Sequence, residues 1–517
     1  FYPIVWHQVA SLGAWSWRET LIANNVLLLA VALVWYLGLV YLARTALPKV
    51  RHAPYLALAA SLLAPVFPWR LTYGAALWPY CMAVATCPAV IAMSIECWRR
   101  ARTLMVVAAR EQNTSVWGAR ARAAMALSAI IPFFVGSCLI HTSAAAMLLW
   151  PLFGILLCQA VYSGIKSWRS ERRAQAAAWW IGALLAVVAF VAFVVLPGPQ
   201  QQHFGRYTEL DWSNLTTKLL IPITLDYFGG WAIEWIEMPL ATLCLLGSAI
   251  CLWRRRNWEL VVAWIFSMSL ILAAIAPIPV LSAFTGLFYR VPHRIKAMTA
   301  VLAVLLVVIA LDALRTWLSP LGARAGSALR GALGRIGLAS VSTAVLRAGA
   351  AVAALAVCLP IMLIGSRAVA TDVREGYLPV HGDTRFIADT AELDMIRRLP
   401  DELPDNAVVI GDPVAGTGYI PILTGMRSVW VFPGQAADDQ DGIYLRENFN
   451  RIHTDPHVCE LLQRHGIHYF YADKDIVFNG NRLSKFRPGL YKVDTSSGFT
   501  LVDSGGSASL WRIDICG

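Results

Sequence analysis

Long apolar stretches alternate with short polar segments over the first two thirds of the chain. A helix needs about 20 apolar residues to cross the hydrocarbon core of a bilayer, and from Leu21 onward ten stretches are candidates. The second is short and runs into Pro68, so it is either a half-span or an oblique one. The predicted spans are residues 21–43, 54–67, 77–97, 121–140, 143–164, 176–196, 235–253, 257–279, 297–316 and 346–366. The pattern predicts a polytopic α-helical membrane protein with about ten transmembrane helices.

The basic residues test this topology independently of hydropathy. Loops must alternate sides, and Lys and Arg concentrate on the cytoplasmic side. Alternate loops and their flanks carry 21 basic residues, and the intervening loops carry 7. The basic loops are residues 44–53, 98–120, 165–175, 254–256 and 315–345. All five fall on one side, which predicts that both ends of the chain lie outside the cytoplasm.

The pattern changes from Arg367 to turns and short alternating runs. Two helices and three strands are predicted, and Leu490–Val493 with Ser509–Ile513 suggests a closing hairpin. The helices lie near 391–400 and 455–466, and the strands near 406–413, 428–434 and 467–473. We therefore expect a transmembrane domain over residues 21–366 and a small extracytoplasmic α/β domain over 367–517.

Residues 1–20 are unusually aromatic and include the stretch FYPIVWHQVASLGAWSW. We expect an external segment in the headgroup layer, with Pro3 near the start of a short surface helix. The stretch has neither an initiator Met nor the basic start of a signal peptide. We expect a further span upstream of Phe1, which would make the chain a fragment or a processed form.

Composition supports a membrane location. Hydrophobic residues make up 58% of the chain and charged residues 15%, against about 25% charged in soluble domains. Up to Ser366 there are 28 Lys and Arg against 11 Asp and Glu, and beyond it 15 against 21. The basic residues lie in short clusters between apolar runs, so membrane orientation explains them and nucleic acid is not an expected partner.

Only two of the ten cysteines, Cys459 and Cys516, lie in the predicted external domain. A disulfide between them is expected in an oxidising exterior, and two free thiols are the alternative. The other eight lie in or beside apolar spans, where cysteine behaves as a small hydrophobe. No Cys or His spacing is typical of a metal site; a bound divalent cation is left open, since no local ligand set demands one.

The stretch GLFYRVPHRIKAM, residues 286–298, breaks the charge pattern. It places Arg290, His293, Arg294 and Lys296 on the side where cations are scarce. The guanidinium group suits a phosphate or pyrophosphate, so one interpretation is a site for an anionic lipid headgroup. General headgroup anchors at the start of a span are the other.

Further candidates lie in external loops and turns. Asp226 and Glu234 belong to the long loop 197–234, and either could act as general base toward a sugar hydroxyl; a solvated loop face is the alternative. His141, between two spans, and His7 could line a cavity or a phosphate site. A histidine satisfied by backbone groups explains them equally.

Two motifs of the tail have simpler explanations. GDPVAGTGYIP, residues 411–421, lacks the Lys-Ser/Thr ending of a phosphate loop, so Gly416 and Gly418 are interpreted as turn residues. Asp473 and Asp475 have a spacing that can hold a metal beside a sugar nucleotide. A solvated turn is the expected interpretation for so short a motif.

Four segments resemble, in the same order, an actinobacterial branch of the glycosyltransferase-C type of membrane proteins. They are FYPIVWHQVASL at 1–12, HTSA at 141–144, FYRVPHRI at 288–295 and IGDPVAGTGYIPILTGM at 410–426. The resemblance implies transfer of a sugar from a polyprenyl-phosphate donor, at the outer face of the bacterial plasma membrane, to a lipid-linked or cell-envelope glycan acceptor. It also implies that Arg290 and Arg294, with His293, bind the donor phosphate. In that family the base usually lies upstream of the Tyr-Pro segment, so the resemblance implies that the principal base precedes Phe1. Asp226 and Glu234 are the candidates within the given sequence.

Two other functions compete with this one. A transporter or lipid flippase would use broken helices and charges at mid-membrane, and the centres of these spans carry almost no charge. A non-enzymatic assembly protein, whose tail binds envelope polymer, is the second alternative.

Overall fold

The computed structural model describes most of the chain. The described residues are 4–15, 17–62, 77–110, 116–195, 234–275, 281–288, 292–335, 388–432, 439–478 and 481–517, with single positions at 360, 363, 367, 370 and 371. The chain divides into two compact units, Phe1–Trp6 with Leu28–Thr371 and His7–Leu27 with Asp372–Gly517. We describe the helical unit first and then the C-terminal domain, residues 388–517.

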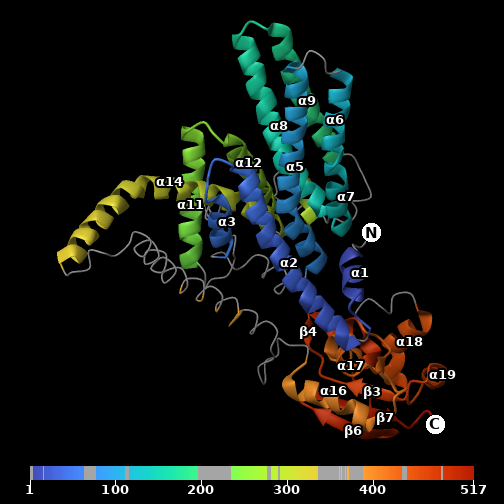
Figure 1. The fold of residues 1–517 in the computed structure, drawn as a ribbon. Coiled ribbons are helices and arrows are strands. Elements are labelled where there is room, and N and C mark those ends of the chain that lie inside the picture. The colour runs from blue at the N-terminus through green and yellow to red at the C-terminus, as the bar shows by residue number, and fades with distance from the viewer. Residues whose placement is uncertain are drawn as a thin grey trace. The chain divides into compact units, whose positions relative to one another are not determined.

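The described part of the first 335 residues is helical (Figure 1). Its helices are α1 (Val5–Ser11), α2 (Trp17–Ala46), α3 (Ala53–Leu62), α5 (Trp78–Arg110), α6 (Val116–Ser128), α7 (Ile130–Ile140), α8 (Ser143–Arg169), α9 (Arg173–Val195), α11 (Glu234–Trp253), α12 (Trp258–Ile275), α13 (Leu281–Phe284), the 3₁₀ helix η3 (Thr285–Phe288) and α14 (Pro292–Arg335).

Seven helical segments within the described ranges are long and apolar enough to cross a membrane. They are Glu19–Ala46, Trp78–Val107, Trp117–Ile140, Ser143–Arg169, Arg173–Ala192, Trp258–Ile275 and Arg294–Pro320. Two more predicted spans correspond to shorter apolar helices, Ala53–Leu62 and Pro239–Trp253. The tenth, 346–366, lies almost entirely outside the described residues. The described helices are therefore consistent with the multi-pass membrane protein that the apolar pattern predicts.

In the most apolar 18-residue stretch of α14, 78% is buried, against at most 44% in the corresponding stretches of the other spans. Helix α14 is therefore the most enclosed of these spans. A Cβ built on Gly247 of α11 would lie 2.0 Å from the Leu306 carbonyl oxygen of α14. Only glycine permits this approach. Close crossings at small residues are a common way for membrane helices to pack.

An aromatic cluster joins the helices that flank the site described below. The indole of Trp150 on α8 lies 4.9–5.7 Å, between ring centroids, from Phe153, Phe190 of α9, Phe266 of α12 and Phe284 of α13. Its Nε1–H donates to the Phe266 carbonyl at 2.7 Å. The indole therefore has a polar partner inside an apolar environment, and it holds α13 and η3 against α8.

The C-terminal domain mixes helices and strands. Its elements are α16 (Thr390–Glu402), β1 (Val408–Ile410), η4 (Pro413–Ala415), α17 (Tyr419–Thr424), β2 (Arg427–Ser428), α18 (Gln440–Asn448), η6 (Phe449–Arg451), α19 (Pro456–Arg464), β3 (Tyr469–Ala472), β4 (Val477–Phe478), β5 (Asn481–Arg482), η7 (Leu483–Lys485), η8 (Pro488–Leu490), β6 (Phe499–Gly505) and β7 (Ala508–Ile513).

Five strands form one sheet in the order β2-β1-β3-β7-β6. Strand β1 runs parallel to β2 and β3, and β7 runs antiparallel to β3 and β6. Successive residues of a strand point to opposite faces, and two core clusters follow this alternation. Val408 and Phe470 pack with residues of α18 and α19, whereas Val409 and Tyr471 pack with residues of α16 and α17. Helices therefore cover both faces of the sheet.

Local signals in the sequence place the helix ends of this domain. Asp389 caps α16 and forms a capping box with Glu392. Asp455 caps α19, and Gly466, at a φ of 61°, follows its end. The predicted hairpin is wrong in one half: β7 pairs with β6, whereas Leu490 belongs to η8 and is buried. Lys492, at a φ of 58°, interrupts any strand there.

Cys459 on α19 and Cys516 form a disulfide, with their Cα atoms 5.1 Å apart. It is the pairing expected from the sequence for an oxidising compartment. The bond joins residues 57 positions apart, so it ties the end of the chain to the helix before β3.

Candidate functional site

The first turn of α5 meets the first turn of α14. Tyr80, only 1% exposed, donates a hydrogen bond from its hydroxyl to the backbone carbonyl of Arg294. The guanidinium carbon of Arg294 lies 5.5 Å from the centroid of the Tyr80 ring. This distance is typical of a cation–π contact, so one aromatic side chain holds both the backbone and the cation of Arg294.

His141 lies in the short turn between α7 and α8 and is buried. Its ring packs edge-on against Tyr80, with centroids 5.2 Å apart. The Ser143 backbone N–H donates to His141 Nδ1 at 3.2 Å. Since Nδ1 accepts, the proton of the neutral ring is on Nε2, which is therefore the donor nitrogen.

A further contact attaches η3 to the same place. The side chain of Ser143, which is fully buried, donates from its hydroxyl to the Leu287 carbonyl. We call Tyr80, His141, Ser143, Leu287 and Arg294 the helix-end cluster. It brings together the start of α5, the α7–α8 turn, the end of η3 and the start of α14. The pattern of basic loops predicts that all of these ends lie on the cation-poor side of the membrane.

Lys296 adds a second cation to the start of α14. It is 5% exposed, and the Thr299 hydroxyl donates to its backbone carbonyl at 2.7 Å. A buried ammonium group is costly in an apolar environment. Together with Arg294 and the positive end of the helix dipole, it gives this end of α14 the electrostatic character that an anion requires.

The structure therefore unites two of the predicted site residues, Arg294 and His141. Tyr80 and Ser143 were missed, although a tyrosine at the start of a predicted span and the HTS turn are visible signals. Four other predicted site residues give no side-chain geometry. Arg290 and Asp226 lie outside the described residues, and the side chains of His293 and Glu234, in the first turns of α14 and α11, are not described.

Helix α1 packs against the start of α5 through one aromatic side chain. Trp6 is fully buried, and its ring centroid lies 5.8 Å from that of Trp78 at the start of α5. His7, predicted to line a cavity, is exposed. Trp15, beyond the end of α1, is 91% exposed. The Trp6 indole is stabilised by apolar contacts with α5. The sequence could not show them, because they depend on how α1 packs.

Carboxylates farther along α5 and α14 have partners of their own. Tyr41 donates to Glu96 Oε2 at 2.8 Å, and Arg315 Nη2 lies 3.2 Å from Asp312 Oδ1. Neither carboxylate belongs to the helix-end cluster.

In the C-terminal domain the GDPVAGTG loop is built for packing. Asp412 is buried and lies 3.2 Å from Arg487 Nη1, and it accepts a hydrogen bond from the Tyr491 hydroxyl at 2.8 Å. Gly416 has a φ of 112°, and a Cβ on Gly418 would lie 2.9 Å from the Pro413 carbonyl oxygen. Both glycines are turn residues, as predicted.

Asp473 and Asp475 have separate partners. Ser507 donates to Asp473 at 2.6 Å, and Ser484 donates to Asp475 at 2.6 Å. Among the described residues, no group of three His, Cys, Asp or Glu side chains has a metal-binding arrangement. The Asp-x-Asp motif thus braces two different turns.

One buried carboxyl group has a strongly shifted pKa. Glu392 of α16 is 1% exposed and accepts a hydrogen bond from the Tyr471 hydroxyl of β3. Burial raises the pKa of this carboxyl to about 8, and the bond from Tyr471 acts in the opposite direction. Glu392 is therefore protonated at neutral pH, and it joins α16 to the sheet as a neutral group.

A family model described as "Family of unknown function (DUF6541)" matches residues 1–515. No curated protein matches the chain. The match covers both the helical unit and the C-terminal domain.

Proposed function

The chain belongs to this family of unknown function, DUF6541, and we propose that it is a membrane glycosyltransferase. It transfers a sugar from a polyprenyl-phosphate donor to a cell-envelope glycan acceptor on the extracytoplasmic side of the membrane. The helix-end cluster binds the donor phosphate. The four sequence segments that resemble glycosyltransferase-C proteins motivate the reaction class, and two of them, around His141 and Arg294, supply residues of this cluster.

The observation that carries the proposal is the convergence of Arg294 with His141 and Tyr80. Arg294 lies at the start of a span, and a lipid-linked phosphate sits at that depth. Its guanidinium group can bind two phosphate oxygens at once. His141 Nε2–H is a further donor for the same anion. A phosphate leaving group gains charge during transfer, and fixed donors at that position stabilise it.

The reaction requires one further group. The acceptor hydroxyl attacks the anomeric carbon, the bond from that carbon to the phosphate oxygen breaks, and polyprenyl phosphate leaves. The hydroxyl proton passes to a carboxylate base within hydrogen-bond reach. Asp226, which precedes α11 in the sequence, and Glu234, the first residue of α11, are the candidates for this base within the chain.

The proposed orientation rests on the basic loops. The Lys- and Arg-rich ends of the spans face the cytoplasm, so the helix-end cluster faces outward. The Cys459–Cys516 disulfide supports an oxidising location for the C-terminal domain. In intact cells, a membrane-impermeant maleimide is expected to label a cysteine at Ser507 and to spare one at Ser170. The reverse pattern would contradict the orientation.

Transfer itself is tested with membranes that contain the full-length protein and radiolabelled polyprenyl-phosphate sugars. We expect Arg294→Ala to reduce transfer about 100-fold, because the loss of one fixed donor to a developing anion costs about 2.7–4 kcal/mol. Arg294→Lys restores the charge but not the two-pronged geometry, so it is expected to recover only part of the rate. Arg315→Ala, on the same helix but beside Asp312, is the matched control.

Three outcomes would contradict the proposal. Equal transfer by the Arg294→Ala and Arg315→Ala proteins would contradict binding of the donor phosphate by Arg294. Movement of the labelled lipid across liposomes without formation of a glycosidic bond would favour a transporter or flippase. Neither transfer nor movement with any of the polyprenyl-phosphate sugars would favour a non-enzymatic assembly protein.

A further inference from the structure

A cleft opens at one edge of the sheet in the C-terminal domain. It has a volume of about 520 Å³, within the range of about 300–1,000 Å³ typical of small-molecule sites. Strands β1, β2 and β3 are parallel and β7 is antiparallel to β3. The starts of the first three strands and the end of β7 therefore meet at this edge, and all four contribute residues to the cleft.

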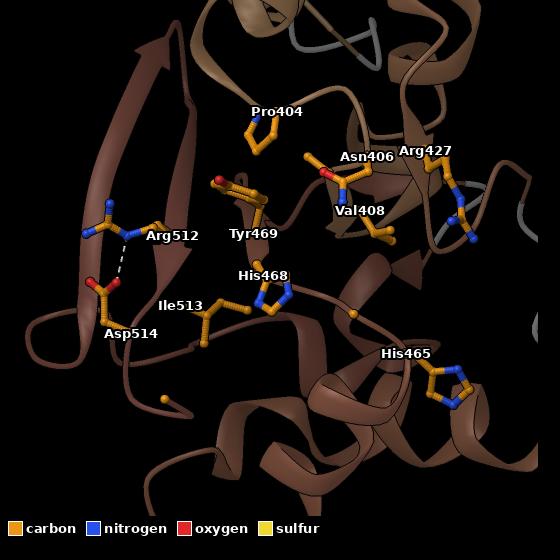
Figure 2. A pocket seen from close by; sticks show the side chains of 13 residues that line it. Pro404, Asn406, Val408, Arg427, His465, His468, Tyr469, Arg512, Ile513 and Asp514 are labelled. Carbon is orange, nitrogen blue, oxygen red and sulfur yellow. Dashed lines mark hydrogen bonds and ion pairs between the residues drawn. The ribbon is translucent and has the colours of Figure 1, made fainter.

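The cleft gathers basic side chains in a domain with an excess of acidic residues. Arg427 begins β2, His468 directly precedes β3, and Arg512 lies near the end of β7. Figure 2 shows His468 in the middle of the cleft, with Arg427 on one side and Arg512 on the other. His465 lines its rim.

Two of these basic side chains have a carboxylate partner within the described part of the domain, and two do not. Arg512 Nε lies 2.7 Å from Asp514 Oδ1, and His465 Nε2 lies 2.8 Å from Asp441 Oδ2. Within the part of the chain that the structure describes, the side chains of Arg427 and His468 form neither an ion pair nor a hydrogen bond. Both are exposed. Arg427 and His468 are thus available to a ligand.

The other residues that line the cleft can contact an uncharged part of a ligand. Pro404 and Tyr469 lie beside each other in the cleft, and Asn406 adds a side-chain amide (Figure 2). The apolar face of a pyranose ring packs on such rings, while an amide matches its hydroxyl groups. A small apolar surface with a few convergent polar groups is the usual composition of a ligand site.

We propose that this cleft binds an anionic sugar, with the carboxylate or phosphate of the sugar on Arg427 and His468 and its ring against Pro404 and Tyr469. Arg427 supplies a two-pronged contact for either anion. Arg512, held by Asp514, is a positioned donor at the other side of the cleft. Binding at this cleft and sugar transfer at the helix-end cluster are separate properties, so each can fail without the other.

Equilibrium binding to the full-length protein in detergent tests the site. The probes are radiolabelled glucuronate, glucose 1-phosphate, glucose and inorganic phosphate. We expect saturable binding of at least one anionic sugar, with glucose and inorganic phosphate each at least 10-fold weaker. Whichever sugar binds more tightly identifies the anion as a carboxylate or a phosphate ester.

Variants then locate the binding. Arg427→Ala is expected to weaken binding of the anionic sugar at least 10-fold and His468→Ala about 5-fold, whereas Arg427→Lys retains part of the affinity. Arg451→Ala, an exposed arginine of the same domain outside the cleft, is the matched control and should bind as the unmodified protein does. Exposed side chains are replaced in every case, and size-exclusion profiles verify folding.

Three results would overturn the proposal. They are the absence of saturable binding by both anionic sugars, equal affinity for glucose or inorganic phosphate, and unchanged binding in the Arg427→Ala and His468→Ala proteins. Sugar transfer by the same preparations is measured in parallel. If binding is absent while transfer persists, only the proposal for the cleft is contradicted.

Discussion

The hydroxyl of Tyr80 on α5 donates a hydrogen bond to the backbone carbonyl of Arg294 on α14, across 214 positions of sequence. The same ring faces the Arg294 guanidinium group and the edge of His141. Tyr80 is therefore the residue through which three helix ends are aligned. Through Tyr80, Arg294, one of the few cations predicted on this side of the membrane, becomes part of the helix-end cluster.

Replacement of Tyr80 by phenylalanine tests this alignment. We expect Tyr80→Phe to lower the free energy of unfolding by about 0.5–1.5 kcal/mol, because one buried hydrogen bond is lost. Transfer should fall several-fold, because the Arg294 backbone is no longer held. Thermal unfolding in detergent and transfer rates provide the two measurements. Tyr162→Phe, at an exposed position of α8, is the control, and an equally small effect of both changes would contradict the role of Tyr80.

The contact between α11 and α14 predicts a large effect of one methyl group. A Cβ at Gly247 would collide with the Leu306 carbonyl, so Gly247→Ala must separate the two helices. Overpacking of this kind costs about 1–3 kcal/mol. Gly136→Ala and Gly182→Ala add the same group where no atom lies within 4 Å. Loss of thermal stability in the first variant alone, measured by fluorescence-detected size exclusion, is the expected result.

The raised pKa of Glu392 makes the stability of the C-terminal domain depend on pH. The folded carboxyl has a pKa of about 8 because it is buried, against an ordinary value of 4.5. The folded state thus binds more protons than the unfolded state between these values, and stability is lost as the pH rises from about 4.5 through 8.

Glu392→Gln should remove most of this dependence, because the amide keeps the neutral form at every pH. Hydrogen exchange of the α16 and β3 peptides, corrected for the intrinsic effect of pH, provides the measurement. Glu447→Gln alters an exposed carboxyl of α18 and is the control. The prediction fails if the Glu392→Gln and unmodified proteins lose protection in parallel between pH 5 and pH 8.

The disulfide predicts a difference between oxidised and reduced protein. Cys459→Ser and Cys516→Ser should each destabilise the C-terminal domain by roughly 2–4 kcal/mol, since the bond closes a long loop in the unfolded chain. Faster proteolysis of residues 388–517, together with loss of the linked peptide in non-reducing mass spectra, is the expected result. Cys158→Ser, a free cysteine of α8, is the control. Two free thiols in the native protein would contradict the assignment.

The apolar pattern by itself determined where long apolar helices of membrane-spanning length lie, because span length and hydropathy are local properties. Local signals also placed the helix that begins at Asp455 and the turn at Gly416, since caps and positive φ angles depend on neighbouring residues. The alternation of basic loops assigned the ends of α5, α8 and α14 to one side. The structure brings those ends together.

Tertiary structure alone decided which residues meet there. Tyr80 carries no signal for a partner 214 residues away, and the burial of Trp6 against Trp78 depends on how α1 packs. The expected strand at Leu490–Val493 failed for the same reason: its alternation matched a strand, yet its apolar residues are buried by packing around η8. The cleft of the C-terminal domain also depends on strand order, because Arg427 lies on β2, Arg512 lies on β7 and His468 directly precedes β3. Contacts between distant segments are set by the packing of whole elements, which no local pattern contains.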